Sequence, residues 1–336
     1  MAEDAALAVT TPLGVLLVNS GTPEAAEPRA VRAFLARFLA DRRVVGLPRL
    51  LWLPLLHGLI LPTRPKHLAR KYRRIWSATG SPLRELSARL RDALSQTLAS
   101  RQAAAVELAM LYSTPELSTA VARLRADGVG RLVVLPLFPQ YCGATTGAVS
   151  DHVQAELGRT GFAPELIFVH DYHRDAAYIE ALRASVAEHW RVHGRTARLL
   201  VSFHGIPERS VRQGDPYYEQ CQESAALLAR ALGLQDGEWS VSFQSRFGPA
   251  GWLKPYTREV LQQLPASGVA EVTVVCPGFA VDCLETLEEI DIENRAVFLR
   301  AGGRRYEYVP ALNAGAGHVQ CLAAVIARHT ARRGAG

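Results

Sequence analysis

The sequence contains two pairs of similar segments that occur in the same order. LLVNSGTPE (residues 16–24) resembles LLVSFHGIPE (residues 199–208) with one inserted residue, and GVGRLVVLPLF (residues 128–138) resembles GVAEVTVVCPGF (residues 268–279). Each copy passes from a short apolar run into a loop with Gly and Pro, the pattern of a buried strand followed by a turn. The repeat predicts two similar domains within the 336 residues, a length that suits two cores of about 150 residues each.

Short apolar runs alternate with longer amphipathic stretches. This alternation predicts an α/β fold of two similar doubly wound domains, with parallel sheets flanked by helices and a cleft between the domains. We place the N-terminal domain at residues 1–160 and the C-terminal domain at 161–336, and we expect the terminal helix to pack back on the first domain. Ligands bind beyond the carboxyl ends of strands in such sheets, so the loops after the repeated strands are candidate sites. Predicted strands cover residues 15–18, 106–112, 132–137, 166–169, 199–203, 240–243 and 272–276, and predicted helices cover 29–39, 83–99, 117–126, 176–193, 217–232 and 283–293.

Charge and cysteine content exclude several classes of protein. The net charge of +6 comes mostly from Arg residues scattered along helical stretches, which argues against a nucleic-acid partner and favours anionic small molecules or an acidic membrane surface. The five cysteines form no CxxC pair, so neither a zinc framework nor a disulfide scaffold is indicated, and a reducing cytoplasm is expected. The N-terminal MAEDAALAVT lacks the apolar core of a secretory signal. Without a coiled-coil pattern, we expect a monomer.

The most apolar stretch is VVGLPRLLWLPLLHGLILP (residues 44–62). It is nearly long enough to span a bilayer, but Pro48, Arg49, Pro54 and His57 interrupt it, and a spanning helix needs about 20 mostly apolar residues. We therefore reject a transmembrane span. Two interpretations stay open: buried core, or an exposed apolar lip that faces a membrane surface or an apolar ligand.

Two features of the second half point to chemistry. His204 follows the apolar run LLVSF, where the first copy of the repeat has Ser20, and an imidazole at a strand end can exchange a proton or coordinate a metal. After the strand VTVVC, the segment DCLETLEEIDIEN places several carboxylates along one stripe of a predicted helix. A solvated acidic face is the ordinary explanation, but such a row can also relay protons or guide a divalent cation. The carboxylates of the stripe are Asp282, Glu285, Glu289 and Glu293.

Other candidates carry less information. The loop QSRFGPAGW (residues 244–252) could present Trp252 as an apolar wall and Arg246 as an anion partner, although an ordinary turn with a packed Trp is the simpler interpretation. RPKHLARKYRRIW (residues 64–76) is a basic helix for which a solvated face is favoured, and GATTG (residues 143–147) could cradle a phosphate. No P-loop or GxGxxG follows the first strand and no GxSxG elbow is present, which argues against a nucleotide enzyme and a serine hydrolase.

Several of these segments together resemble the ferrochelatases. The matching motifs run along nearly the whole chain: NSGTPE, FLARFLADRRVV, SFHGIPERSVRQGDPY, QSRFGPAGWLKP and CPGFAVDCLETLEEIDIE. Cys283 stands where many relatives have a histidine, and its segment looks like a proteobacterial subtype of the protoporphyrin enzymes. The resemblance implies a lyase of haem biosynthesis that inserts ferrous iron into protoporphyrin IX, giving protohaem and releasing two protons.

The resemblance also implies roles for individual residues. His204 and Glu285 are the implied catalytic pair and the contacts of the substrate iron, with Glu289 and Glu293 continuing an acidic path. We expect the porphyrin to contact Ser20, Arg64, Tyr141, Arg246 and Trp252. Ser20 departs from the Leu, Met or Tyr of many relatives, and Leu111 replaces a basic residue, which removes an anion contact. The cysteine pattern that holds an iron–sulfur cluster in animal relatives is missing, so we expect no cofactor, iron being a substrate.

Two rival functions remain. One is a related chelatase that acts on coproporphyrin, or on sirohydrochlorin with cobalt, and the loss of a basic residue at Leu111 slightly favours the less acidic protoporphyrin. The other is a non-catalytic carrier of porphyrin or haem, which needs a pocket but no polar groups on both sides of the ring. We expect a cytoplasmic protein, with peripheral contact at the inner face of the membrane through residues 44–62.

Overall fold

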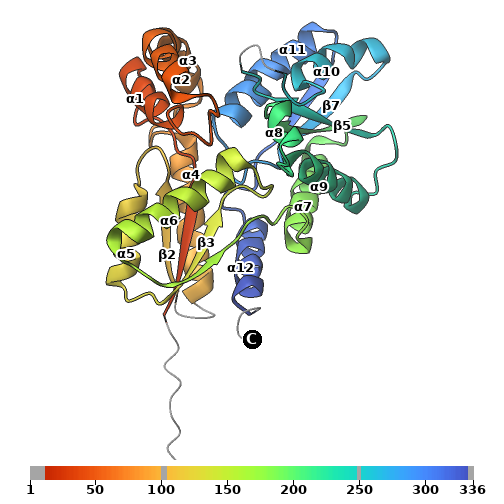
Figure 1. Ribbon diagram of the computed structural model, residues 1–336. Helices are drawn as coiled ribbons and strands as arrows, with labels where there is room; N and C mark the ends of the chain where they lie inside the picture. Colours follow the sequence, from red (N-terminus) through yellow and green to blue (C-terminus); the bar gives the residue numbers. More distant parts are fainter. Residues whose placement is uncertain (1–11, 100–103, 248–250, 332–336) are drawn as a thin grey trace, which may run out of the picture.

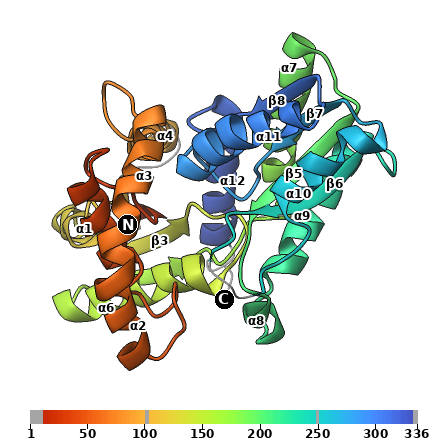
Figure 2. The same ribbon diagram turned by 90° about the horizontal axis from the view of Figure 1, so that it is seen from above.

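The computed structural model describes residues 12–99, 104–247 and 251–331. They form two four-stranded parallel sheets of identical topology, β2-β1-β3-β4 and β6-β5-β7-β8, which lie side by side (Figures 1 and 2). The repeated segments occupy equivalent central strands: β1 pairs with β3, and β5 pairs with β7. The predicted pair of doubly wound α/β domains is confirmed. The strands are β1 (Leu13–Asn19), β2 (Ala104–Met110), β3 (Arg131–Pro136), β4 (Glu165–Phe168), β5 (Arg198–His204), β6 (Trp239–Gln244), β7 (Glu271–Val275) and β8 (Arg305–Val309).

The first sheet extends beyond residue 160, where the sequence placed the domain boundary. β4 pairs in parallel with β3, with Leu132 opposite Leu166, so the segment up to Phe168 belongs to the first half. The boundary therefore falls in the crossover between β4 and α7 (Ala176–His193). β8 was not among the predicted strands; it pairs with β7 at one edge of the second sheet.

Helices cover both faces of each sheet because alternate strand residues point to opposite faces. In β1, Val15 and Leu17 enter one core, whereas Leu16 and Val18 enter another. α5 (Leu117–Ala126) and α6 (Ala148–Thr160) cover the outer face of the first sheet. The outer face of the second sheet is covered by α10 (Thr257–Gln263), the 3-10 turn η3 (Pro265–Ser267), the π-helix η4 (Glu285–Asn294) and α11 (Arg295–Arg300).

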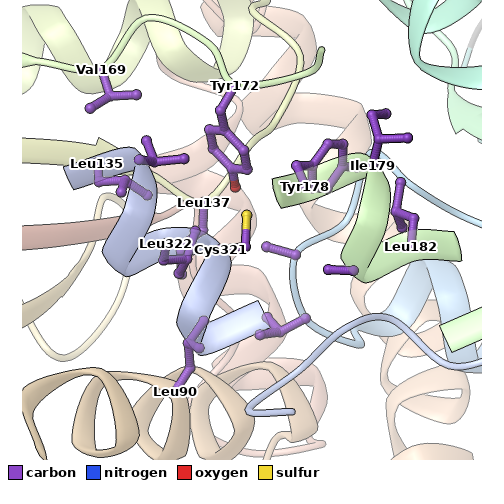
Figure 3. Packing of buried hydrophobic residues seen from close by; sticks show 14 of the residues in the cluster. Leu90, Leu135, Leu137, Val169, Tyr172, Tyr178, Ile179, Leu182, Cys321 and Leu322 are labelled. Carbon is purple, nitrogen blue, oxygen red and sulfur yellow. The ribbon is translucent and has the colours of Figure 1, made fainter. Parts of the chain in front are cut away.

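One large core joins the two halves. It includes residues of both sheets together with α4 (Pro82–Ala99), α7, α9 (Tyr217–Ala231) and α12 (Ala316–Ala331). Tyr172 of the crossover and Cys321 of α12 point toward one another within it (Figure 3). The terminal helix α12 packs on both α7 and α4, and the Arg131 guanidinium of the first sheet donates to the Thr330 carbonyl at 3.2 Å. The halves are thus held by a continuous apolar core.

The apolar stretch at residues 44–62 folds as part of a helical layer beside the first sheet. This layer consists of α1 (Pro28–Phe38), α2 (Arg49–Leu55), the π-turn η1 (Leu56–Ile60) and α3 (Leu61–Ile75). Trp52, Leu56 and Ile60 are buried in its core, whereas Leu51, Leu55 and Leu59, one residue earlier in each case, are exposed. One face of the stretch is therefore buried core, and the other is exposed and apolar. No helix in the described part of the chain is long and apolar enough to cross a membrane.

Candidate functional site

His204 is the last residue of β5, at the point where the second sheet changes its winding direction. β6 lies on one side of β5 and β7 on the other, so the loops after β5 and β7 diverge from neighbouring strands. Ligands of open α/β sheets bind at such switch points. The short helix α8 (Glu208–Arg212) follows the β5 loop, and η4 follows the β7 loop. The topology therefore brings the predicted histidine and the predicted acidic helix to the same edge of the sheet.

The imidazole of His204 has a fixed orientation. Its Nδ1 lies 2.6 Å from the carbonyl oxygen of Gly205. A carbonyl can only accept, so Nδ1 carries the proton of the neutral ring and Nε2 carries the lone pair. Nε2 is then available as a base or as a metal ligand.

The loop of Trp252 is pinned against the His204 loop. The Leu253 N–H donates to the Ile206 carbonyl at 3.0 Å, and the Glu208 N–H donates to the Gly251 carbonyl at 3.0 Å. A Cβ on Gly205 would lie 3.4 Å from Cε3 of Trp252, so the indole packs directly on the residue after His204. The sequence left open an ordinary turn with a packed Trp, and the indole does pack, beside the candidate base.

The acidic segment forms a π-helix, η4, rather than the predicted α-helix. π-helical segments are rare and occur frequently at functional sites. Two residues at the end of β6 hold it: Gln244 Nε2 donates to the Glu285 carbonyl at 3.0 Å, and Ser245 donates to the Glu289 carboxylate through its N–H at 2.8 Å and through its hydroxyl. Ser245 adopts φ 65°, a left-handed conformation that is unusual for serine. The sequence predicted neither Gln244 nor Ser245 as a site residue, because such contacts depend on the register of β6.

The surroundings of the Glu289 carboxylate change its acidity. Burial raises its pKa, while hydrogen bonds from Ser245 and the nearby His204 ring oppose the rise. The Glu285 carboxylate raises the pKa further by repulsion. A raised pKa allows a carboxylate to accept and hold a proton nearer neutral pH. His204, Glu285 and Glu289 thus form one electrostatic cluster.

Glu285 is surrounded by groups that keep their own protons. The Cys283 thiol contacts its side chain, and burial together with the Glu285 charge raises the pKa of Cys283 well above its usual value. Burial likewise raises the pKa of Tyr72, with a further contribution from Glu285. Tyr72 comes from α3, so the helical layer of the first half reaches the acidic helix of the second.

The other acidic residues of the segment are already paired. Asp282 accepts from Thr286, Tyr308, Asn313 and the Ala311 N–H, so it holds the loop after β7 and does not continue the predicted stripe. Glu293 lies 2.7 Å from the Lys71 ammonium. Glu288, which the sequence did not indicate, binds both Lys71 and Arg74. The basic helix at residues 64–76 was expected to be solvated, but two of its cations face η4.

The residues predicted to contact the substrate come from both halves. Ser20 and Tyr141 follow β1 and β3; the Ser20 N–H donates to Asn19 Oδ1 at 2.8 Å, and the Tyr141 N–H donates to Gln220 Oε1 at 2.6 Å. Arg64 lies over the Phe247 ring at 3.9 Å, and burial lowers its pKa. Arg246 lies over the Tyr256 ring at 4.8 Å. The Arg64 contact brings α3 and the loop after β6 together, two segments far apart in the sequence.

The loop GATTG does not present an open cradle. It forms the π-turn η2 (Gly143–Gly147), and the Gly143 N–H donates to the Asp215 carboxylate of the second half at 2.8 Å. The Gly143 N–H is therefore already bonded to a carboxylate and is not available to a phosphate. The contact instead joins the two halves next to Tyr141.

Two open hollows lie away from these residues. One of about 410 Å³ is lined by α7 and the segment before α12, and one of about 390 Å³ lies beside the end of β2 and α6. Neither is lined by His204, Glu285 or Glu289. Within the described ranges, no three His, Cys, Asp or Glu side chains stand ready to hold a metal ion together. We therefore identify the candidate site from the end of β5 and from η4, not from a pocket.

Comparison with known proteins supports one family. The sequence matches the family model described as ferrochelatase over residues 12–330. A ferrochelatase of Aeromonas hydrophila is 49% identical over 324 residues, covering 96% of this chain and 100% of the relative. A ferrochelatase of Methylococcus capsulatus is 51% identical over 309 residues, covering 92% of this chain and 94% of the relative. Among solved structures, the sirohydrochlorin chelatase SirB of Bacillus subtilis subspecies spizizenii, in complex with cobalt, is similar with a TM-score of 0.56 at 12% identity, covering 95% of each chain, which shows a shared fold.

Proposed function

Because the chain belongs to the ferrochelatase family, we propose that it inserts ferrous iron into protoporphyrin IX, giving protohaem and releasing two protons. Family membership makes the protein a metal chelatase of haem biosynthesis. We propose the identity of the porphyrin and the roles of the individual residues. In this proposal the porphyrin lies between the two halves, with Ser20 and Tyr141 on the first-half side and Trp252, Arg64 and Arg246 around it.

Metallation replaces two pyrrole N–H protons with one divalent ion. The reaction therefore needs a base near the ring nitrogens and an acceptor for iron that has lost its water shell. His204 supplies the base through Nε2 and contacts the incoming iron together with Glu285. Glu289 and Glu293 continue the acidic path along η4, carrying protons outward or iron inward.

The observation that carries this proposal is the fixed tautomer of His204 beside a carboxylate of raised pKa. The Gly205 carbonyl holds the proton on Nδ1, and so directs the lone pair of Nε2 away from the backbone. Burial raises the pKa of Glu289, so this carboxylate can take up a proton released nearby. A carrier that only stores porphyrin has no need for this combination.

An anaerobic insertion assay with ferrous iron tests the proposal. We expect turnover with protoporphyrin IX, and a loss of at least about 100-fold in kcat for His204→Ala and for Glu285→Gln, because general base catalysis contributes about 10²–10⁴-fold. His193→Ala and Glu259→Gln are matched controls: both side chains are exposed, and neither belongs to the site. Near-normal turnover in both site variants would refute the assigned roles.

The same assay distinguishes the rival functions when substrates are offered in parallel. A higher kcat/KM for coproporphyrin, or for sirohydrochlorin with cobalt, would contradict the choice of protoporphyrin. Tight porphyrin binding by the wild-type protein without any insertion would favour a carrier. We expect neither, because Leu111 provides no cation for an additional propionate.

We further propose that iron enters only as a substrate and that the protein carries no iron–sulfur cluster. All five cysteines are buried and free of disulfide bonds, and no three of them gather in the described part of the chain: Cys142, Cys221, Cys276, Cys283 and Cys321. A cluster needs several thiolates around one centre. Purified protein is therefore expected to contain no acid-labile sulfide, and stoichiometric sulfide would overturn this part of the proposal.

We propose that the exposed face of α2 and η1 contacts an anionic membrane surface from the cytoplasmic side. Leu50 is 90% exposed and Leu51 72% exposed, a degree that is unusual for neighbouring leucines. Exposed Lys66 and Arg70 of α3 belong to the same helical layer. Apolar insertion and attraction to acidic lipid headgroups act together in peripheral binding.

A further inference from the structure

Lys71 of α3 stands between two carboxylates of η4. Its ammonium lies 3.0 Å from Glu288 Oε2 and 2.7 Å from Glu293 Oε2. The two carboxylates differ in environment: the Glu288 side chain is 1% exposed, whereas the Glu293 side chain is 35% exposed. One cation thus joins a buried charge to a solvent-accessible charge.

Glu288 cannot lose its cations without penalty. An ionised carboxylate that is buried without a partner is strongly destabilising, so Glu288 keeps a counter-charge close to it. It has two, because Arg74 also binds it at 2.7 Å through its other oxygen. Glu288 therefore anchors Lys71 beside η4 regardless of what Glu293 binds.

Glu293 has no such constraint. Its half-exposed carboxylate binds Lys71 at a surface where an exchange of partners costs little, because water can solvate either group during the exchange. A divalent cation attracts a carboxylate more strongly than an ammonium does at the same distance, since its charge is doubled. Iron arriving at Glu293 can displace Lys71, which remains neutralised by Glu288.

We propose that Lys71 is a positioning residue for iron entry: it occupies Glu293 in the resting protein, yields it to ferrous iron, and remains held by Glu288. This inference rests on the proposed function, in which Glu293 belongs to the iron path. Lys71 thereby weakens the hold of the path on iron. Without it, the Glu293 carboxylate would face the ion with no ammonium beside it.

The test compares variants that change the charge at Lys71 without leaving the buried Glu288 carboxylate short of a counter-charge. In Lys71→Met/Glu288→Gln, both partners become neutral, so no buried charge is left alone and the exposed Arg74 remains solvated. We expect the KM for ferrous iron to fall about three- to tenfold relative to wild type, because Glu293 loses the ammonium that occupies it while the net charge of the protein stays the same. The KM for porphyrin should stay within about twofold. The iron effect should shrink as ionic strength rises.

Two further variants fix the interpretation. Lys71→Arg keeps the charge and should restore a wild-type KM for iron, whereas Glu293→Gln removes the exchangeable ligand and should raise that KM. Thermal unfolding of each variant identifies loss of fold, which would lower the apparent kcat through the smaller active fraction and would not change the KM for iron alone. An unchanged iron KM in a folded Lys71→Met/Glu288→Gln protein, or parallel changes in both KM values, overturns the inference while leaving the chelatase activity in place. Absence of turnover in the wild-type protein would instead refute the proposed function and this inference with it.

Discussion

Gly205 occupies a position at which a side chain has no room. A Cβ there would lie 2.9 Å from the Gln244 carbonyl oxygen, a backbone atom that is itself bonded to the Gly205 N–H. We predict that Gly205→Ala destabilises the protein by about 1–3 kcal/mol, the usual range for overpacking. It should also reduce insertion activity, because the shift moves the carbonyl that orients His204. Urea unfolding and the insertion assay measure the two effects.

Gly58→Ala is the matched control for this prediction. Gly58 lies in η1 with nothing within 4 Å of an added Cβ, and its φ is ordinary. Alanine in a helical position is more favourable than glycine by about 0.5–1 kcal/mol. Equal stability of the two glycine variants would show that the contact between Gly205 and Gln244 is not restrictive.

Ser245 affects the acidity of Glu289, whereas Gly205 affects packing. Its two hydrogen bonds lower the pKa of Glu289 against the rise caused by burial. Ser245→Ala removes the hydroxyl donor, so the pKa of Glu289 should rise and Glu289 should stay protonated to higher pH. We predict that the acidic limb of the pH profile of kcat moves to higher pH. Ser267→Ala, an exposed serine of η3, should leave the profile in place.

Among the elements, η4 shows what the sequence could and could not predict. Its position after the β7 loop and its role as the acidic element followed from the repeat and from the carboxylate spacing. Its π-helical hydrogen bonding did not, because ten residues of apolar periodicity do not separate i→i+4 from i→i+5 bonding. The pairing of Glu288 with Lys71 was also not predictable, since residues 217 positions apart share no local pattern.

The edge strand β8 was missed for a related reason. RYEYV alternates charged and aromatic residues, with Arg305 and Glu307 partly exposed and Tyr306 and Tyr308 buried. The predicted strands were recognised as apolar runs, which is the pattern of strands buried on both faces. The edge strand β8, with one face partly exposed, does not show a continuous apolar run. The central strands β1, β3, β5 and β7 were all recovered because they are apolar on both faces.

The helix α2 and the turn η1 allow the two faces of one apolar stretch to be separated experimentally. We predict that Leu50→Asp and Leu51→Asp leave the unfolding free energy nearly unchanged and weaken binding to vesicles containing anionic lipid. Their side chains bury little surface on folding, at 90% and 72% exposure, but they would enter the lipid interface. Vesicle co-sedimentation and urea unfolding provide the measurements.

Leu56→Ala serves as the contrasting variant from the same stretch. Leu56 is fully buried, so we expect a loss of about 2–5 kcal/mol in stability with little change in vesicle binding by the remaining folded protein. If the Leu50 and Leu51 variants bind vesicles as well as wild type does, the exposed face is not a membrane contact.

At the scale of the whole molecule, the two halves share a topology but differ at the equivalent strand ends. β1 ends in Asn19, whose side chain accepts from the Ser20 N–H, whereas β5 ends in His204. The first half instead contributes α3, whose Lys71, Arg74 and Tyr72 reach η4. The duplicated fold therefore supplies two similar sheets, and the candidate site combines α3 of the first half with His204 and η4 of the second.

The crossover between the halves is held by a buried histidine. His173 lies 2.8 Å from the Asp171 carboxylate through Nδ1 and 2.8 Å from the Glu223 carboxylate of α9 through Nε2. Both carboxylates can accept, so the charged ring donates from both nitrogens and this geometry favours the imidazolium form. Burial lowers the pKa of His173, but the two hydrogen bonds outweigh it and raise the pKa above its usual value. The Ser224 hydroxyl also donates to the His173 carbonyl, which ties the crossover to α9.

This arrangement predicts a stabilising contribution of His173 that declines as the solution becomes basic. A group whose pKa is higher in the folded than in the unfolded state stabilises fully below the unfolded value, about 6.5, and loses that contribution as pH rises through the folded pKa. We expect the contribution of His173 to the unfolding free energy to decline as pH rises above about 6.5, whereas His189 and His318, whose pKa values are lowered by burial, contribute in the opposite direction. His152, which pairs with Asp41 and also has a raised pKa, changes stability in the same direction as His173.

The variant His173→Gln isolates the contribution of the crossover. Glutamine offers a donor but no titration, so its stability should be lower than that of wild type at pH 6 and should fall less toward pH 9. The difference between the two proteins, measured by urea unfolding, removes the shared contribution of His152. A difference that stays constant across this range would show that His173 is not charged in the folded protein. If the stability difference between wild type and His173→Gln decreases as pH rises, then His173 loses its proton over this range and thereby destabilises the junction of the two halves.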